Sequence, residues 1–305
     1  MVNEILNIKS CDLDVVNLPQ ILAREVRVEV LRLDKIHEVV SGNKWFKLKY
    51  YVDDAIKQKK SILTLGGPYS NHLLATAWIA NGLGIHSVGL VRGEKPSYMS
   101  HTLQLAGNLN MELVYLTRNE YRKRDSSDFI AELVQSYPHC IIIPEGGNGN
   151  LGVRGSEEIL STIDTEKYTH IACAMGTGTT LIGLTNASRK DQCILGFPVL
   201  KIAKDQFLRK CRILSSEEKS KCISIFDTYH FGGYAKKTPG LLKFMNNFFA
   251  RTGIPTDFVY TGKLFYGVLD LIAAGYFPPG SILLIVHSGG LQGNLSLEAG
   301  SLDFT

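Results

Sequence analysis

The chain has 305 residues, of which 45% are hydrophobic and 20% are charged, a composition typical of a globular protein and too apolar for a disordered one. Its 33 basic and 29 acidic residues give a formal net charge of +4. So small an excess of positive charge argues against a nucleic-acid partner.

The apolar runs, such as Cys140–Ile143 and Ile282–Val286, are too short to span a membrane. Met1–Asp12 lacks the basic and apolar regions of a signal peptide. The six cysteines and eight histidines do not have the spacing of a disulfide scaffold or a zinc site. We therefore expect a cytoplasmic, reduced protein that holds no metal and has neither a nucleic-acid nor a membrane partner.

In chain order, the hydrophobic pattern predicts a strand at Val26–Leu33 and a helix that starts at Asn43. From Ser61 onward, short apolar strands alternate with helix-length segments. The strands are expected at Ile62–Leu65, Ser87–Val91, Leu113–Leu116, Cys140–Ile143, His170–Ala174, Cys193–Phe197, Cys222–Phe226 and Ser281–Val286. The helices are expected at Asn71–Gly82, Tyr98–Ala106, Glu120–Ser136, Pro239–Arg251 and Lys263–Ala274.

Strands that are apolar throughout and are joined by helices indicate parallel sheets covered on both faces. There are more of them than one sheet usually holds. The sequence therefore predicts an α/β protein of two domains, each an open, mostly parallel twisted sheet covered by helices. The smaller domain is expected over residues 47–146, and the larger over residues 1–46 plus 147–305.

Glycines follow several of the predicted strands, at Gly66–Gly67, Gly146–Gly147, Gly176 with Gly178, and Gly289–Gly290. In open α/β sheets the carboxyl ends of the strands line the ligand crevice, where the backbone approaches the ligand closely. One glycine pair is most often only a turn. Several pairs at equivalent strand ends indicate a ligand site.

The segment Met175–Thr180, Met-Gly-Thr-Gly-Thr-Thr, lies between a predicted strand and an apolar helix. Such a loop offers main-chain N–H groups, hydroxyls and a helix N-terminus to a phosphate. No Gly-Lys-Ser/Thr follows, and the last glycine of G-x-G-x-x-G is missing. The loop favours a small organic phosphate, with an ordinary glycine-rich turn as the equal alternative.

Lys44 lies at a predicted helix start, in the segment Ser41-Gly42-Asn43-Lys44. The helix dipole disfavours a protonated amine there, and an imine-forming lysine needs the neutral form. Lys47 follows one turn later and could meet an anion. The alternative is that both are solvated surface lysines.

Ser70, Asn71 and His72 follow Gly66–Gly67 at the start of another predicted helix. Hydroxyl, amide and imidazole groups at a helix N-terminus, together with its N–H groups, suit a carboxylate. The alternative is a plain helix cap, because serine and asparagine are both good N-cap residues.

Together, S-G-N-K-x-x-K-L, G-G-x-x-S-N, the threonine-rich glycine loop, Y-T-G-K and H-S-G-G resemble a known family. They are similar to the pyridoxal-phosphate enzymes grouped as 1-aminocyclopropane-1-carboxylate deaminase and D-cysteine desulfhydrase, of the tryptophan-synthase-β-like fold type. The resemblance runs from about Asp34 to the C-terminus. It implies pyridoxal 5′-phosphate in a cleft between two α/β domains, a small amino-acid substrate and a homodimer.

The resemblance also implies a role for each matching residue. Lys44 would bind the cofactor covalently, and Asn71 would contact its 3′ oxygen. Ser70 would lie near the substrate carboxylate and Cα, and Tyr234 and Tyr260 would face the substrate. The resemblance implies two further groups of cofactor-binding residues. Those at the phosphate would be Lys47, Gly176, Thr177, Gly178, Thr179 and Thr180, and those near the pyridine ring would be Thr261 and Ser288.

Three residues depart from the ring-opening deaminases. Those enzymes carry glutamate at the position of Thr261, leucine at that of Ser288 and glutamine at that of His72. The two hydroxyls look like the D-cysteine desulfhydrase branch. A hydroxyl holds the pyridine nitrogen protonated less firmly than a carboxylate, so the electron sink is weaker and suits the expulsion of a good leaving group.

The resemblance therefore implies a lyase that eliminates and deaminates a small amino acid, with D-cysteine converted to pyruvate, ammonia and hydrogen sulfide. The alternative is 1-aminocyclopropane-1-carboxylate deaminase, which forms 2-oxobutanoate and ammonia. β-Replacement or racemisation on the same scaffold is a third reading. Lys44 argues against a non-catalytic anion binder, and the missing last glycine argues against a nicotinamide enzyme.

Overall fold

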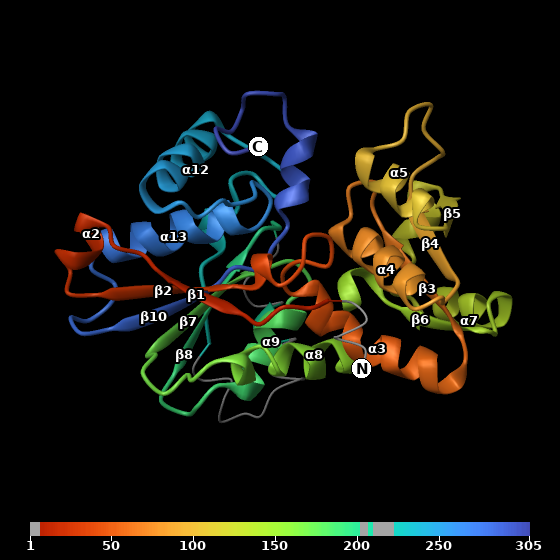
Figure 1. The fold of residues 1–305 in the computed structure, drawn as a ribbon, viewed down its shortest axis with the longest axis horizontal. Helices are drawn as coiled ribbons and strands as arrows, with labels where there is room; N and C mark the ends of the chain where they lie inside the picture. The colour runs from red at the N-terminus through yellow and green to blue at the C-terminus, as the bar shows by residue number, and fades with distance from the viewer. Residues whose placement is uncertain (1–6, 202–206, 210–222) are drawn as a thin grey trace. The chain divides into compact units, whose positions relative to one another are not determined.

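Two β-sheets, both covered by helices, organise the chain in the computed structural model, which describes residues 7–201, 207–209 and 223–305 (Figure 1). The chain divides into two compact units. The first unit comprises residues 7–8, His37–Val40 and Lys44–Gly155. The second comprises the described parts of Lys9–Ile36, Ser41–Asn43 and Ser156–Thr305. The predicted α/β class with two mostly parallel sheets is confirmed.

The first unit is built on a four-stranded, fully parallel sheet. Its strands, in sheet order, are β5 (Met111–Leu116), β4 (Ser87–Arg92), β3 (Ser61–Gly66) and β6 (Cys140–Ile143). Its helices are α3 (Lys44–Gln58), α4 (Asn71–Gly82), α5 (His101–Asn108), α6 (Arg118–Arg122) and α7 (Ser127–Ser136), with the 3-10 turn η2 (Glu145–Gly147).

Alternate residues of β3 face opposite sides of this sheet. Leu63 and Leu65 pack in one apolar cluster with Tyr121 of α6 and Leu133 of α7. The residue between them, Thr64, points to the other side, as the two-residue repeat of a strand requires. There it contacts the first turn of α4. This polar contact inside a buried layer belongs to the site described below.

The second unit contains a sheet of six described strands, which are parallel except for β1 at one edge. Its strands, in sheet order, are β1 (Asp12–Val15), β2 (Arg27–Arg32), β10 (Ile282–Val286), β7 (His170–Met175), β8 (Cys193–Pro198) and β9 (Ile223–Ile225). Its helices are α2 (Pro19–Leu22), α9 (Thr179–Ala187), α12 (Pro239–Thr252) and α13 (Thr261–Ala273). The helix α8 (Asn150–Glu157) precedes β7, and the 3-10 turns are η1 (Leu33–Lys35), η3 (Leu160–Thr162), η4 (Asp227–His230) and η5 (Leu291–Ser296).

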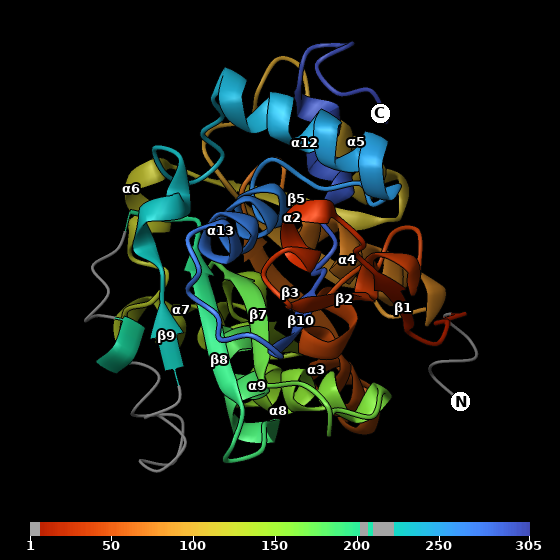
Figure 2. The same ribbon diagram turned by 90° about the vertical axis from the view of Figure 1, so that its left-hand side faces the viewer.

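Helices α13 and α9 cover opposite faces of this sheet, as Figures 1 and 2 show. One large apolar core joins α13 and α2 to the strands. Alternate strand residues contribute to it, namely Val28, Val30, Ala172, Ala174, Leu195, Phe197, Leu283 and Ile285. Because β10 and β7 are parallel neighbours, the residues that follow both strands emerge at the same edge of the sheet.

The sequence pattern missed β1, α2 and α8, which are short and therefore show little periodicity. The helix predicted at Glu120–Ser136 is wrong, because the segment forms two helices, α6 and α7. Each has its own cap: Thr117 forms a capping box with Glu120, and the Ser126 hydroxyl accepts a hydrogen bond from the N–H of Phe129.

Within the described ranges, no helix is both long and apolar enough to cross a membrane. Among the described residues, Cys11, Cys140, Cys173 and Cys193 form no disulfide bond, whereas Cys211 and Cys222 lie outside the described residues. The described part of the chain contains no group of three or more side chains placed to hold a metal ion.

Candidate active site

The glycine loop of the second unit connects β7 to α9. Gly178 is the N-cap of α9, with φ +85°, and it provides no side chain to cap the first turn. The hydroxyls of Thr177 and Thr179 lie 2.9 Å apart, and Thr179 and Thr180 are buried. The first N–H groups of a helix have no partner inside it, so this loop presents N–H and O–H donors of the kind that bind phosphate.

Asn43, the residue before Lys44, is hydrogen-bonded to this loop. Its side-chain Nδ2 donates to the Thr180 Oγ1 at 2.8 Å, and its main-chain N–H donates to the carbonyl of Ser288 at 3.3 Å. Because the Thr180 oxygen accepts from Asn43, its own hydrogen can still be donated to an anion. Lys44 is the next residue in the chain, so its main chain begins directly beside this contact.

Gly42 lets the chain pass the end of β10. It has φ +72°, and a Cβ atom on it would lie 1.8 Å from the carbonyl oxygen of Ser288. An L-residue is excluded both by that contact and by the left-handed backbone. The close approach of Gly42 to Ser288 sets the position of Asn43.

The two predicted tyrosines lie close to each other and to the glycine loop. A Cβ atom at Gly176 would lie 3.4 Å from the Tyr260 ring and 3.6 Å from its hydroxyl oxygen. The rings of Tyr234 and Tyr260 meet edge to face, with centroids 6.1 Å apart. The structure therefore brings Gly176, Tyr260 and Tyr234 together in the second unit.

Buried Asp257 organises the start of α13. Its carboxylate accepts from the N–H groups of Val259, Tyr260 and Thr261, at 2.8 to 2.9 Å, and from the Thr261 hydroxyl at 2.7 Å. The N–H of Asp257 donates to the same hydroxyl at 2.7 Å. The only hydroxyl hydrogen of Thr261 is thus directed at Asp257, so toward any other group this hydroxyl can only accept.

Lys263, in the first turn of α13, is 1% exposed. Its Nζ donates to the carbonyls of His230 at 2.9 Å and Gly233 at 2.7 Å. Burial lowers the pKa of this lysine to about 8. The sequence predicted no role for this lysine of the Y-T-G-K motif.

His287, the residue before Ser288, is buried and belongs to a network of polar side chains. His287 lies 2.7 Å from the carbonyl of Pro255 through Nε2 and 3.2 Å from Asp34 through Nδ1. Arg32 pairs with Asp34 at 2.7 Å and also with Asp14. Burial alone would raise the pKa of Asp34, but the neighbouring His287 and Arg32 outweigh it and lower the pKa. This network holds η1 against the end of β10.

In the first unit, α3 begins at Lys44, and Lys47 is only 5% exposed. A Cβ atom at Gly147 would lie 3.1 Å from the Cβ of Lys47, so the lysine stem packs against the turn after β6. The alternative of a solvated surface lysine is therefore wrong for Lys47.

Ser70 caps α4, since its Oγ accepts from the N–H of Leu73 at 3.3 Å. The next residue, Asn71, has a buried side-chain oxygen without a partner in the described structure. A buried amide group without a hydrogen bond costs free energy. The cap accounts for the Ser70 hydroxyl, whereas the unpaired side-chain oxygen of Asn71 leaves this amide able to bind another group.

His72 is buried beside Thr64. The Thr64 hydroxyl donates to the carbonyl of Ile143 at 2.9 Å, so its contact of 2.8 Å with His72 Nε2 requires the histidine to donate. Burial, with the charges of Lys47 and Lys44, lowers the pKa of His72 well below its usual value. The ring is therefore neutral, and its unprotonated Nδ1 has no partner among the described residues.

These residues fit pyridoxal phosphate. Within the second unit, the donor-rich loop that starts α9 suits the phosphate of this group. Within the first unit, Lys44 at the start of α3 has the amine that an imine needs, and the side-chain oxygen of Asn71 is buried without a partner among the described residues. Asp257, Lys263 and the Asp34–His287 pair were not predicted from the sequence. Asp257 lies six residues before Lys263, where the sequence predicted the helix to start, so no N-cap position marked it.

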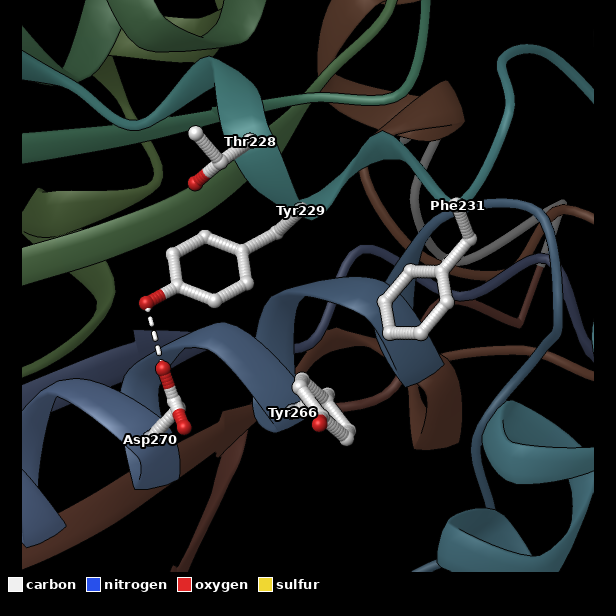
Figure 3. Close-up of a pocket in the computed structure, with 5 residues that line it drawn as sticks. All are labelled: Thr228, Tyr229, Phe231, Tyr266 and Asp270. Atoms are coloured by element: carbon white, nitrogen blue, oxygen red, sulfur yellow. Dashed lines mark hydrogen bonds between the residues drawn. The ribbon is translucent and has the colours of Figure 1, made fainter.

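A pocket elsewhere in the second unit is lined by Thr228, Tyr229, Phe231, Tyr266 and Asp270 (Figure 3). The Tyr229 hydroxyl donates to Asp270 at 2.7 Å, as the dashed line in Figure 3 marks. Burial and this carboxylate raise the pKa of Tyr229 to about 12, so the phenol stays protonated at neutral pH. None of these side chains is one that the sequence analysis assigned to the site.

Known proteins resemble this chain over most of its length. The sequence pattern of the family described as "Pyridoxal-phosphate dependent enzyme" matches residues 15–289. A Pyrococcus furiosus relative, by its name a candidate 1-aminocyclopropane-1-carboxylate deaminase, is 32% identical over 83% of this chain and 82% of its own. The D-cysteine desulfhydrase of Yersinia pestis is 25% identical over 90% of this chain and 88% of its own.

A solved structure described as that of an ACC deaminase homologue superposes with a TM-score of 0.80 and is 26% identical. The superposition covers 96% of this chain and 95% of that one.

Proposed function

The chain belongs to the family of pyridoxal-phosphate dependent enzymes, as a lyase of the group that contains 1-aminocyclopropane-1-carboxylate deaminases and D-cysteine desulfhydrases. From that premise we propose that its substrate is D-cysteine, which it converts with water to pyruvate, ammonia and hydrogen sulfide.

The main support for D-cysteine as the substrate is the hydroxyl of Thr261. At a position where the ring-opening deaminases carry glutamate, this chain has a neutral group whose only hydrogen is directed at Asp257. Ser288 supplies a second hydroxyl where those enzymes carry leucine. Neutral oxygens hold a protonated pyridine nitrogen weakly, and a weak electron sink suffices when the leaving group is a thiolate.

Pyridoxal phosphate supplies, when bound, the electron withdrawal that makes the Cα–H bond of an amino acid acidic. The chain's own residues would then do the rest. Thr177, Thr179, Thr180 and the N–H groups of Gly176 and Gly178 would hold the phosphate, with Lys47 as a positive charge for it. Asn71 would hydrogen-bond the 3′ oxygen.

Lys44 would bind the cofactor through Nζ and, once the substrate amine has displaced it, would be an amine placed to take the Cα proton. Tyr234 and Tyr260 would face the substrate. Ser70 and the first N–H groups of α4 would hold the substrate carboxylate, because the positive end of a helix favours an anion.

A substrate panel tests this assignment. The purified, cofactor-loaded protein is incubated with D-cysteine, L-cysteine, D-serine, β-chloro-D-alanine and 1-aminocyclopropane-1-carboxylate, and the keto acid, ammonia and sulfide are measured. We expect sulfide and pyruvate from D-cysteine in equal amounts. Pyruvate from the L-isomer but not from the D-isomer would overturn the proposed stereochemistry.

The second candidate is 1-aminocyclopropane-1-carboxylate deamination to 2-oxobutanoate and ammonia, which the names of several relatives favour. The same panel distinguishes the two activities by their keto acids. The resemblance further predicts a homodimer in the cytoplasm, for which sedimentation velocity and cell fractionation are the direct measurements.

A further inference from the structure

The segment that carries Tyr234 has an unfavourable backbone. Phe231 and Ala235 have φ +51° and +53°, and the glycines between them, Gly232 and Gly233, have φ +94° and +119°. A left-handed conformation costs a residue with a Cβ atom free energy and persists only when its surroundings enforce it. Something outside this segment must therefore hold it.

Lys263 provides that constraint. Its ammonium group donates to the carbonyl of His230, just before the left-handed stretch, and to that of Gly233 within it. The lysine is buried, and a hydrogen bond from a charged donor is about twice as strong as a neutral one. The burial of this amine is unfavourable in itself, as its lowered pKa of about 8 shows, so the two carbonyl bonds compensate a real cost.

The lysine lies on the helix whose first residues carry the second tyrosine. Tyr260 is the N-cap of α13, three residues before Lys263. Its main-chain N–H donates a hydrogen bond to the carboxylate of Asp257 at 2.8 Å. Tyr234 is 46% exposed, and its ring meets that of Tyr260 edge to face. Lys263 therefore links the two segments from which the tyrosine rings project.

We propose that Lys263 is a positioning residue of this enzyme: it anchors the His230–Gly233 turn to α13 and thereby holds Tyr234 against Tyr260 to receive the substrate. The inference rests on the proposed function, in which both tyrosines face the substrate. Lys263 touches neither substrate nor cofactor in this account. Its effect on turnover passes through Tyr234.

A double-mutant cycle tests this coupling. Lys263→Met keeps the aliphatic stem but removes the donor group, and Tyr234→Ala removes the ring that the lysine positions. We expect Lys263→Met to lower kcat/KM about ten-fold in the otherwise unchanged enzyme. In the Tyr234→Ala enzyme it should cost less than about two-fold. Equal losses in both backgrounds would overturn the proposal, because a general structural defect does not depend on Tyr234.

Hydrogen exchange of the cofactor-loaded protein provides a readout without turnover. In Lys263→Met the amides of Gly232, Gly233 and Lys236 should exchange about ten-fold faster, while those of β7 stay unchanged. Lys243→Met, at an exposed lysine of α12, is the matched control and should change neither. Unchanged exchange at the three loop amides would contradict the anchoring role even if D-cysteine proves not to be the substrate.

A third variant tests the backbone argument. Ala235→Gly removes the cost of a left-handed alanine and should restore part of the kcat/KM lost in Lys263→Met. No recovery would contradict the idea that the lysine enforces this conformation. Should Lys263→Met fail to fold, Lys263→Gln, which keeps an N–H donor without the charge, takes its place in the same cycle with the same criterion.

Discussion

The side chain of Asn43 donates a hydrogen bond to the hydroxyl of Thr180 at 2.8 Å, across 137 residues of sequence. This bond connects the residue before the candidate cofactor lysine to the candidate phosphate loop. Both ends lie in the second unit, while Lys44 is the first residue of α3 in the other. Asn43, which directly precedes Lys44 in the sequence, is therefore held at the candidate phosphate loop.

Replacement of Thr179 and Thr180 together by valine should weaken cofactor binding. The change removes two hydroxyl donors and breaks the bond from Asn43, but leaves the N–H groups of the loop. We expect a loss of roughly 1–3 kcal/mol in cofactor binding free energy, the range for hydrogen bonds to a charged group. A fluorescence titration of the cofactor-free protein measures it.

Thr185→Val is the matched control, because Thr185 is buried in the same helix and its hydroxyl donates to the carbonyl of Leu181 within that helix. Cofactor affinity that is equal in the double variant and in the control would place the phosphate elsewhere.

Lys44→Ala should abolish turnover and remove the visible absorption that a lysine-bound cofactor produces, because the amine supplies both the covalent bond and the nearest base. Absorption spectra before and after borohydride reduction, with mass spectrometry of the reduced peptide, check the result. Lys57→Ala, at an exposed lysine in the last turn of the same helix, should keep both. A coloured and active Lys44→Ala protein would refute the assignment.

Gly42→Ala should destabilise the fold by more than about 3 kcal/mol, since the new Cβ atom would overlap the Ser288 carbonyl in a left-handed backbone. Gly253 has a similar φ of +68° but nothing within 4 Å of such an atom. Gly253→Ala should therefore cost only the backbone term, about 1 kcal/mol. Denaturant unfolding of the two variants measures the difference, and similar losses would contradict the close approach of Gly42 to Ser288.

Lys263 should make the free energy of unfolding increase with pH in the alkaline range. Burial lowers its folded pKa to about 8, whereas an unfolded lysine titrates near 10.4. Between these values the unfolded chain binds more protons, so this residue's contribution to stability is unfavourable below pH 8 and improves as the pH rises toward 10.4. The free energy of unfolding should rise across this window relative to that of Lys263→Met. Parallel curves for the two proteins would show that the lysine is not buried as described.

The sequence predicted the buried strands well, because a run such as Cys140–Ile143 is apolar throughout and is flanked by turn residues. It missed β1, whose four residues are mostly exposed and pair with β2 at the edge of the sheet. It also merged α6 and α7, because their apolar spacing continues across the break and only the Ser126 cap separates them.

The parts of the candidate site that lie within a short sequence motif could be predicted from the sequence. Ser70, Asn71 and the Met175–Thr180 loop lie at helix starts after apolar strands, where the sequence placed them. Lys263 and His287 could not be predicted, because their partners lie 30 and 253 positions away in sequence. The role of Asn43 depends in the same way on a distant hydroxyl.

The most direct test of the proposed substrate compares kcat/KM for two substrates in one preparation of the cofactor-loaded enzyme. Its activity is measured with D-cysteine, as sulfide and pyruvate, and with 1-aminocyclopropane-1-carboxylate, as 2-oxobutanoate. The hydroxyls of Thr261 and Ser288 predict kcat/KM for D-cysteine at least about a hundred-fold higher, a difference of roughly 2.7 kcal/mol in transition-state stabilisation. Ring opening as efficient as desulfhydration would contradict the proposed substrate.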